Sequence, residues 1–235
     1  MYKRQIYIDR AVSKNILWVD NRSPLIIGVD PATSHGPSAS TIVYRAGPKA
    51  DNIQRYQNIE PEQLAELLYE QAINSRASAV VIDRTEGVGD HVYTWLRTRL
   101  GPNVKVLGVI FSQRPIRKDL YANARAELYG GALNWIRASV DIPDDPLFIK
   151  ELKTIKRKSQ SDTKLQLIPK SEMLKEGLAS PDSADAFALT FYVPAQSPEH
   201  FINRPKFAAR SPAFTHGKSS RPSFASNYSR PNINR

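Results

Sequence analysis

Two aspartates of this sequence each follow directly on a continuous apolar segment. Residues 24–29 (Pro-Leu-Ile-Ile-Gly-Val) lead into Asp30, and residues 79–82 (Ala-Val-Val-Ile) lead into Asp83. Such runs, bounded by turn residues, are typical of strands buried on both faces, and Pro31 helps to end the first because proline lacks a backbone donor. Open α/β sheets bind ligands at the carboxyl ends of their strands. If these two strands are neighbours, roughly 4.8 Å apart, their aspartates could share one metal ion.

A third acidic position is a pair of aspartates at the start of an expected helix. Ser180 and Pro181 predict that start, the serine as N-cap and the proline at the first helical position. Asp182 and Asp185 are three residues apart and so should share a helix face. A carboxylate in the first turn also stabilises the helix dipole, so Asp182 has a purely structural alternative that Asp185 lacks. Asp30 has one as well, because aspartate often caps a turn.

These acids indicate metal chemistry based on oxygen ligands. The chain has no cysteine, and hard carboxylate ligands suit Mg²⁺ or Mn²⁺ better than zinc. Two such ions roughly 4 Å apart can activate a water and stabilise the leaving oxygen in phosphodiester hydrolysis. An uncompensated acidic cluster repels itself, so it must bind cations or shift its pKa values. Glu86 and Asp90 could reach a second ion and His35 could polarise a water, although solvated loop side chains are the commoner reading of all three.

The charge of the chain indicates an anionic partner, with nucleic acid as the first candidate. The formal net charge is +10, and residues 203–235 carry seven basic and no acidic side chains. Lys156, Arg157 and Lys158 lie on one arm of an expected hairpin and could contact DNA phosphates, a solvated arm being the alternative. Neither a signal peptide nor an apolar run of membrane-spanning length is present, which predicts a cytoplasmic protein without a membrane partner.

The pattern of elements predicts an α/β fold with a mixed sheet flanked by helices. An antiparallel meander of three strands is expected first, followed by helices alternating with parallel strands. A short helix, a basic hairpin and a last helix should complete the fold. The expected strands are 24–30, 39–45, 52–59, 79–83 and 104–111, and the hairpin arms are 154–158 and 164–168. The expected helices are 61–76, one that follows a turn at 87–90 and runs through 100, 123–139, 144–153 and one from 181.

The chain is expected to divide into three parts. Residues 1–23 show scattered apolar anchors without a period and predict a connecting arm. Residues 24–193 should form the folded domain. Residues 194–235 are rich in Ser, Pro, Asn and Arg and should be disordered or ordered only by a partner.

Four segments follow one another in the sequence, namely residues 27–32 (IGVDPA), 81–89 (VIDRTEGVG), 121–129 (YANARAELY) and 180–191 (SPDSADAFALTF). In this order they resemble the nuclease domain of the large terminase subunits of tailed bacteriophages, and the resemblance spans about residues 5–193. It implies a ribonuclease-H-like fold and a metal-dependent endonuclease that cuts concatemeric double-stranded DNA during viral genome packaging, using two Mg²⁺ or Mn²⁺ ions.

The resemblance also implies roles for single residues and for partners. Asp30, Asp83 and Asp185 would be the catalytic metal ligands, with Asp182 as an accessory ligand. Double-stranded DNA, a portal protein and a terminase small subunit would be the partners, and the host cytoplasm the location. Members of that family normally carry an N-terminal packaging ATPase. This sequence has no ATPase signature, since Gly217-Lys218-Ser219 lacks the earlier glycine and the preceding strand of a P-loop, so motor activity is not implied.

Two alternatives remain open from the sequence. A Holliday-junction resolvase would share the fold and the acidic cluster, and would act on branched DNA. A non-catalytic module that binds DNA or a portal protein would need neither metal nor intact carboxylates, and the presence of acids at all three positions argues against it.

Overall fold

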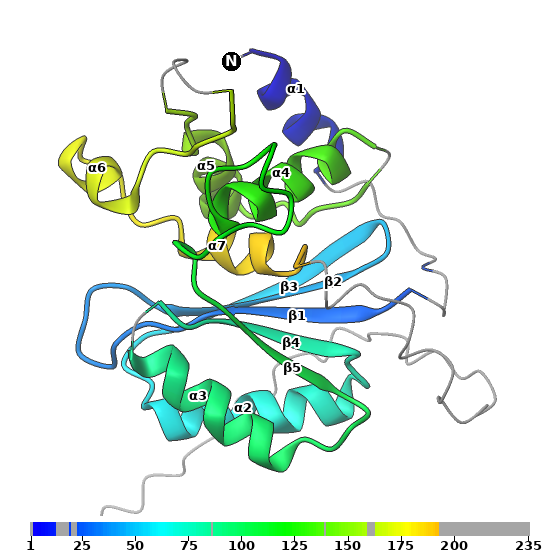
Figure 1. Ribbon diagram of the computed structural model, residues 1–235. Coiled ribbons are helices and arrows are strands. Elements are labelled where there is room, and N and C mark those ends of the chain that lie inside the picture. Colours follow the sequence, from blue (N-terminus) through cyan, green and yellow to red (C-terminus); the bar gives the residue numbers. More distant parts are fainter. Residues whose placement is uncertain are drawn as a thin grey trace, which may run out of the picture. The chain divides into compact units, whose positions relative to one another are not determined.

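A five-stranded mixed sheet runs through the part of the chain that the computed structural model describes, namely residues 2–12, 19, 23–85, 87–138, 140–158 and 163–192 (Figure 1). The strand order is β3-β2-β1-β4-β5. The first three strands form an antiparallel meander, and β4 and β5 are parallel to β1, as the sequence predicts. The strands are β1 (Leu25–Asp30), β2 (Ser40–Ala46), β3 (Lys49–Tyr56), β4 (Ala79–Asp83) and β5 (Lys105–Val109).

Helices cover both faces of the sheet (Figure 1). On one face lie α2 (Pro61–Asn74) and α3 (Gly87–Arg99). The other face is covered by α7 (Asp182–Leu189), with further helices packed behind it. These are α1 (Tyr2–Ala11), α4 (Ala124–Ile136), α5 (Pro146–Thr154) and α6 (Lys170–Lys175).

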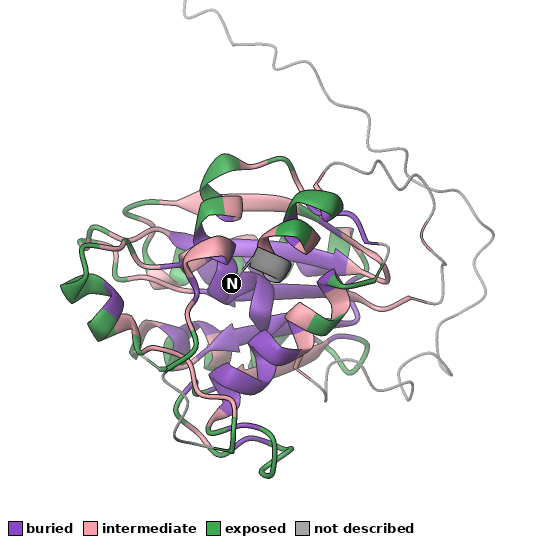
Figure 2. Ribbon diagram, turned by 90° about the horizontal axis from the view of Figure 1, so that it is seen from above, coloured by how far each residue is buried: buried purple, intermediate pink, exposed green. Residues whose placement is uncertain are grey.

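Each face has its own apolar core, and β1 contributes to both. Ile26 belongs to the core under α7, whereas its neighbour Ile27 belongs to the core under α2 and α3. Both side chains are fully buried, which explains why the sequence of β1 is apolar without alternation. In Figure 2, buried residues gather in the middle of the described unit and exposed ones at its margins.

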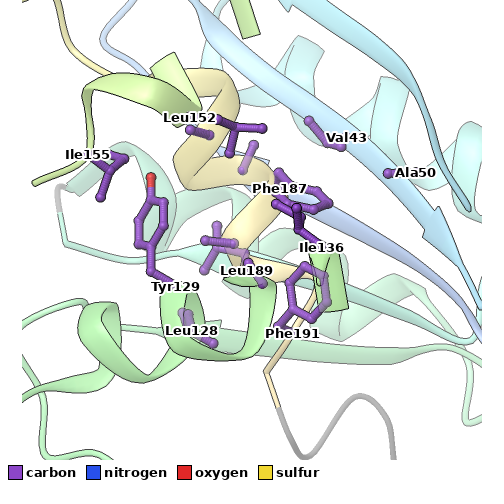
Figure 3. Packing of buried hydrophobic residues seen from close by; sticks show 14 of the residues in the cluster. Val43, Ala50, Leu128, Tyr129, Ile136, Leu152, Ile155, Phe187, Leu189 and Phe191 are labelled. Atoms are coloured by element: carbon purple, nitrogen blue, oxygen red, sulfur yellow. The ribbon is translucent and has the colours of Figure 1, made fainter. Parts of the chain in front are cut away.

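The short helix α7 approaches the sheet closely because β1 has a glycine beneath it. A Cβ atom at Gly28 would lie 2.0 Å from the carbonyl oxygen of Ala186, so any other residue would push the helix away. Figure 3 shows Phe187 and Leu189 of α7 among residues of the sheet and of α4, including Val43 and Leu128. The helix is therefore held rigidly over the strand that ends at Asp30.

Three sequence expectations about local structure need correction. The helix expected after a turn at residues 87–90 begins at Gly87 itself, so those residues form its first turn. The third strand covers Lys49–Tyr56 rather than 52–59, because Gly47 adopts a φ of 51° and lets Ala46 pair with Lys49 across a tight turn. The last helix begins at Asp182, so Pro181 rather than Ser180 occupies the N-cap position, with φ −88° and ψ 54°.

Two helices were not expected from the sequence. The helix α1 lies where a connecting arm is predicted; Ile8 and Ala11 are buried, and Val12 forms a bridge with Ile142. The other is α6. The proposed boundaries at residues 23 and 193 stay predictions, and the tail from 194 lies outside the described residues.

The two arms of the expected basic hairpin do pair. Arg157 and Leu167 form an antiparallel bridge, and the backbone N–H of Lys158 donates to the carbonyl of Gln166 at 2.9 Å. Among the described helices, none combines the length and the apolarity needed to cross a membrane.

Candidate active site

Asp30 and Asp83 leave the sheet at one edge because β1 and β4 are parallel neighbours. Val29 pairs with Ile82, so the aspartates that follow these two residues lie side by side at the carboxyl ends of the strands. Each is only 6% exposed. The strand neighbours that the sequence predicts are thus present.

Asp185 comes to the same edge from α7 and is surrounded by donors. It is 0% exposed. Its Oδ1 accepts hydrogen bonds from Tyr129 Oη at 2.7 Å and from Arg125 Nε at 3.1 Å, and its Oδ2 lies 2.9 Å from Lys170 Nζ. Burial by itself would raise the pKa of Asp185, but Arg125 and Lys170 outweigh it and hold that pKa below its usual value. Asp185 is therefore an ionised carboxylate.

Lys170 joins Asp185 to Asp30. Its Nζ lies 3.3 Å from Asp30 Oδ2, so a single ammonium bridges the two acids. Burial nevertheless raises the pKa of Asp30 well above its usual value; Lys170 opposes that rise, and the charges of Asp185, Asp83 and Asp182 add to it. The pKa of Lys170 is raised by the same carboxylates although burial acts against this. The attraction of Lys170 thus does not offset the effect of burial on the pKa of Asp30.

Asp83 is held by neutral donors rather than by a cation in direct contact. Its Oδ1 accepts from both the backbone N–H and the hydroxyl of Thr85. Burial raises the pKa of Asp83, and the two Thr85 hydrogen bonds oppose the rise. A Cβ atom at Gly89 would lie 1.9 Å from the Asp83 carbonyl oxygen, so this glycine lets α3 begin directly against the end of β4.

Asp182 is half-buried at the first position of α7. Its charge raises the pKa of Asp30 and also that of Glu151. It therefore lies within electrostatic range of the cluster, as an accessory position would.

The acids fit a divalent cation in their chemistry, although they do not form a finished metal site. Among the described residues, no three carboxylate or imidazole side chains converge closely enough to hold an ion. The cation that lies between Asp30 and Asp185 is the ammonium of Lys170. The donors are all oxygens, as Mg²⁺ and Mn²⁺ prefer. Burial is the main cause of the raised pKa values of Asp30 and Asp83, and a divalent cation beside them would favour their ionised forms.

Of the other residues singled out in the sequence, His35 and Asp90 do not join this cluster. His35 is exposed, and Asp90 forms an ion pair with Arg84 on the outer side of α3. His91 Nε2 lies 3.0 Å from Glu62 Oε1, and Glu86 is outside the described residues.

The three cations of the hairpin arm differ in their surroundings. Lys156 Nζ lies 2.6 Å from Glu176 Oε2, whereas Arg157 and Lys158 are exposed. Arg157 and Lys158 are therefore turned to solvent. The hairpin that carries them continues into the candidate site, because the carbonyl of Ile168 accepts a hydrogen bond from Arg125 and Lys170 follows two residues later.

Sequence reasoning missed the residues that hold the acids in place. Arg125 and Tyr129 lie within residues 121–129, four residues apart and thus on one helix face, which was an available signal. Lys170 carries no such signal, because it follows Pro169 in a segment without apolar periodicity. Thr85 could have been noticed only as the hydroxyl residue two positions after Asp83.

Comparison with known proteins relates the fold to phage enzymes. Neither a protein-family model nor a curated protein sequence matches the chain. Among solved structures, the nuclease domain of the large terminase subunit gp2 of bacterial virus Sf6 superimposes with a TM-score of 0.70 and 21% identity, over 81% of this chain and 97% of that chain.

Two further structures of this kind contain metals. The K428A mutant of the Sf6 nuclease domain with manganese and β-thujaplicinol has a TM-score of 0.69 at 21% identity, over 81% of this chain and 97% of that one. The large terminase nuclease of thermophilic phage G20c with bound cobalt has a TM-score of 0.54 at 16% identity, over 74% and 82%. The mixed sheet flanked by helices is thus the ribonuclease-H-like fold of terminase nucleases.

Proposed function

We propose that this chain is a divalent-metal-dependent endodeoxyribonuclease of the viral terminase type, which cuts concatemeric double-stranded DNA during genome packaging. The observation that carries the proposal is the bridge that Lys170 makes between Asp30 and Asp185, beside the end of the neighbouring strand that carries Asp83. The fold adds support, because its solved neighbours are terminase nuclease domains, several of them with metals bound.

Asp30, Asp83 and Asp185 are the residues that would hold two Mg²⁺ or Mn²⁺ ions, with Asp182 as an accessory ligand. Bound ions of this kind polarise the scissile phosphate and make a bound water nucleophilic at neutral pH. The protein's contribution is to position the ligands. Arg125 and Tyr129 fix the rotamer of Asp185 from one side, so that Oδ2 faces Lys170 and the other acids.

Lys170 occupies the space between the proposed metal ligands. Its ammonium neutralises Asp30 and Asp185 in the state without metal, which reduces the cost of burying them. Since it lies between ligands of the same ions, it must withdraw when a divalent cation binds. Lys170 is 34% exposed in its side chain and begins the short helix α6, so it has space to turn away.

The substrate and partners follow from charge and from the neighbours. Double-stranded DNA would lie along the basic hairpin, where Lys156, Arg157 and Lys158 contact phosphates without reading sequence. A portal protein and a terminase small subunit are the proposed protein partners, and the host cytoplasm is the proposed location.

A plasmid-nicking assay tests the proposal. We expect supercoiled DNA to be nicked with Mg²⁺ or Mn²⁺ and to stay intact with EDTA. Asp83→Asn should abolish nicking, whereas Asp51→Asn, a matched change at an exposed aspartate of β3, should leave it unchanged. Metal-independent nicking, or equal nicking by both variants, would contradict the proposal. Strong preference for a four-way junction over linear duplex would favour the resolvase instead.

A further inference from the structure

Residues 110–122 form a long loop that begins at the candidate active site. It follows β5, whose last residue, Val109, is paired with Asp83. The backbone N–H of Phe111 donates to the Thr85 hydroxyl that also binds Asp83, and the Phe111 ring centroid is 5.8 Å from Lys170 Nζ. The start of this loop is therefore close to the acids.

The loop is anchored in its middle by a buried carboxylate. Glu127 of α4 is 5% exposed, and it accepts from the backbone N–H groups of Ile116 at 2.6 Å and Arg117 at 3.2 Å. It also forms an ion pair with the Arg117 side chain, at 2.8 Å from Nε. A buried acid that binds two loop amides and a guanidinium fixes the loop in one conformation.

The end of the loop is attached to the basic hairpin. The N–H of Leu165 donates to the carbonyl of Leu120 at 2.8 Å, and the N–H of Ala122 donates to the carbonyl of Leu165 at 3.0 Å. The loop and the hairpin arm 164–168 thus form one continuous surface beside the acids.

The anchored segment exposes two apolar side chains among three basic ones (Arg114, Arg117 and Lys118) and one acidic one, Asp119. Ile116 and Leu120 are each 55% exposed, among the most exposed large apolar side chains of the described residues. Arg114 and Lys118, two residues to either side of Ile116, are exposed as well. What makes this segment a candidate contact surface is the combination of exposed apolar and basic side chains on a loop that Glu127 holds in place and that is hydrogen-bonded to the basic hairpin.

We propose that the loop 110–122 is a second DNA-contacting element, which places Ile116 and Leu120 in the minor groove of the duplex while Arg114 and Lys118 contact the flanking phosphates. The proposal rests on the proposed nuclease function for its substrate. Aliphatic side chains framed by cations are the usual means by which proteins enter the minor groove. Because Glu127 already orders the loop, little conformational entropy would be lost on binding. The contact would set the position of the scissile strand relative to Asp83.

Binding of a short fluorescent duplex in EDTA tests this without requiring cleavage. The double variant Ile116→Ala/Leu120→Ala should bind about tenfold more weakly with an unchanged salt dependence. Arg114→Ala and Lys118→Ala should each lower the log–log salt slope by roughly 0.9. Ile73→Ala on α2, at a residue 49% exposed, and Arg137→Ala beyond the far end of α4 are the matched controls.

The outcomes separate this proposal from the nuclease assignment. Wild-type affinity in all loop variants, with metal-dependent nicking intact, would overturn the loop's role alone and would leave a protein partner as its occupant. Equal weakening in the controls would also overturn it. A minor-groove ligand such as distamycin should compete with the wild type; competition only by the major-groove ligand methyl green would refute the groove assignment.

Discussion

The two faces of the sheet are built from different kinds of side chain. Under α2 and α3 the helices bury only apolar residues and one glycine, whereas α4, α5 and α7 bring ionisable side chains into the opposite core. The buried residues of the first face include Leu64, Ala65, Leu68, Ala72, Val92 and Leu96, and those of the second include Arg125, Glu127, Glu151 and Asp185.

The difference indicates that one face of the sheet mainly stabilises the fold and that the other carries the candidate site. An apolar face stabilises the fold in proportion to the area it buries, with no constraint on charge. A buried charge costs several kcal/mol unless it is paired, so a protein keeps such groups mainly where they act. The face of α7 is thus the face on which stability has been given up for function.

The acids around α7 also differ from one another. Asp185 has direct cationic partners and a lowered pKa. Glu151, on the neighbouring α5, caps the start of α7 by accepting from Ala184 N–H at 2.9 Å, and burial raises its pKa to about 7. At the other end of α7, Arg45 Nη2 donates to the Thr190 carbonyl at 2.7 Å, where a cation complements the helix dipole. Of Asp185 and Glu151, it is Asp185 whose ionised form is favoured by cations in direct contact.

The largest expected contrast is between substituting an acid on the α7 face, which should affect cleavage, and substituting a leucine on the face of α2 and α3, which should affect stability. Asp30→Asn, Asp83→Asn or Asp185→Asn should abolish DNA cleavage, because each removes a ligand charge, yet leave the fold intact. Leu68→Ala on α2 should cost about 2–5 kcal/mol of unfolding free energy and leave cleavage per folded molecule unchanged. Urea melts and plasmid nicking measure both. Near wild-type cleavage by one of the asparagine variants at saturating Mn²⁺ would remove that residue from the site.

The next contrast concerns the cations. Arg125→Met should lower the unfolding free energy by about 3–5 kcal/mol, because Asp185 is then buried with its first cationic partner missing. Adding Asp185→Asn should recover part of the loss, since the uncompensated charge is gone. Urea denaturation of the two single variants and the double variant gives the coupling. Simple additivity would show that the pair does not interact as described.

The smallest effect should come from Glu151 and depend on pH. Because its pKa is about 7 in the folded protein and 4.5 in the unfolded reference, the folded state binds more protons between these values. Stability should therefore fall as pH rises through this window, and Glu151→Gln should remove the fall. The variant should gain up to about 3 kcal/mol relative to wild type between about pH 5 and pH 8, measured without metal. Glu66→Gln, at an exposed residue of α2, should show no such gain.

Most of the fold could be predicted from sequence because it is encoded locally. The apolar runs before Asp30 and Asp83 and the helix after Pro61 are where the sequence places them. Two of the failures occurred where a contact distant in sequence decides the structure. The helix α1 is held by packing on α5 and α4, and the start of α7 is capped by Glu151, 33 residues away, rather than by Ser180.

In the candidate site too, some residues could be predicted from local sequence patterns and others could not. Its aspartates have sequence signals, because strand ends and helix starts are visible in a pattern. Lys170 has none, since its ion pair with Asp30 joins residues 140 positions apart. Nothing in the surrounding segment distinguishes this lysine from a solvated one.

A crystal structure of the protein soaked in Mn²⁺ tests the central claim most directly. We expect manganese at the sheet edge, in contact with Asp30 together with Asp83 or Asp185, and the Lys170 side chain displaced from the position between Asp30 and Asp185. In the Lys170→Ala variant, which lacks the competing ammonium, manganese should occupy the same position at a lower Mn²⁺ concentration. Manganese bound instead at His35 and His91, with Lys170 still bridging Asp30 and Asp185, would contradict the account.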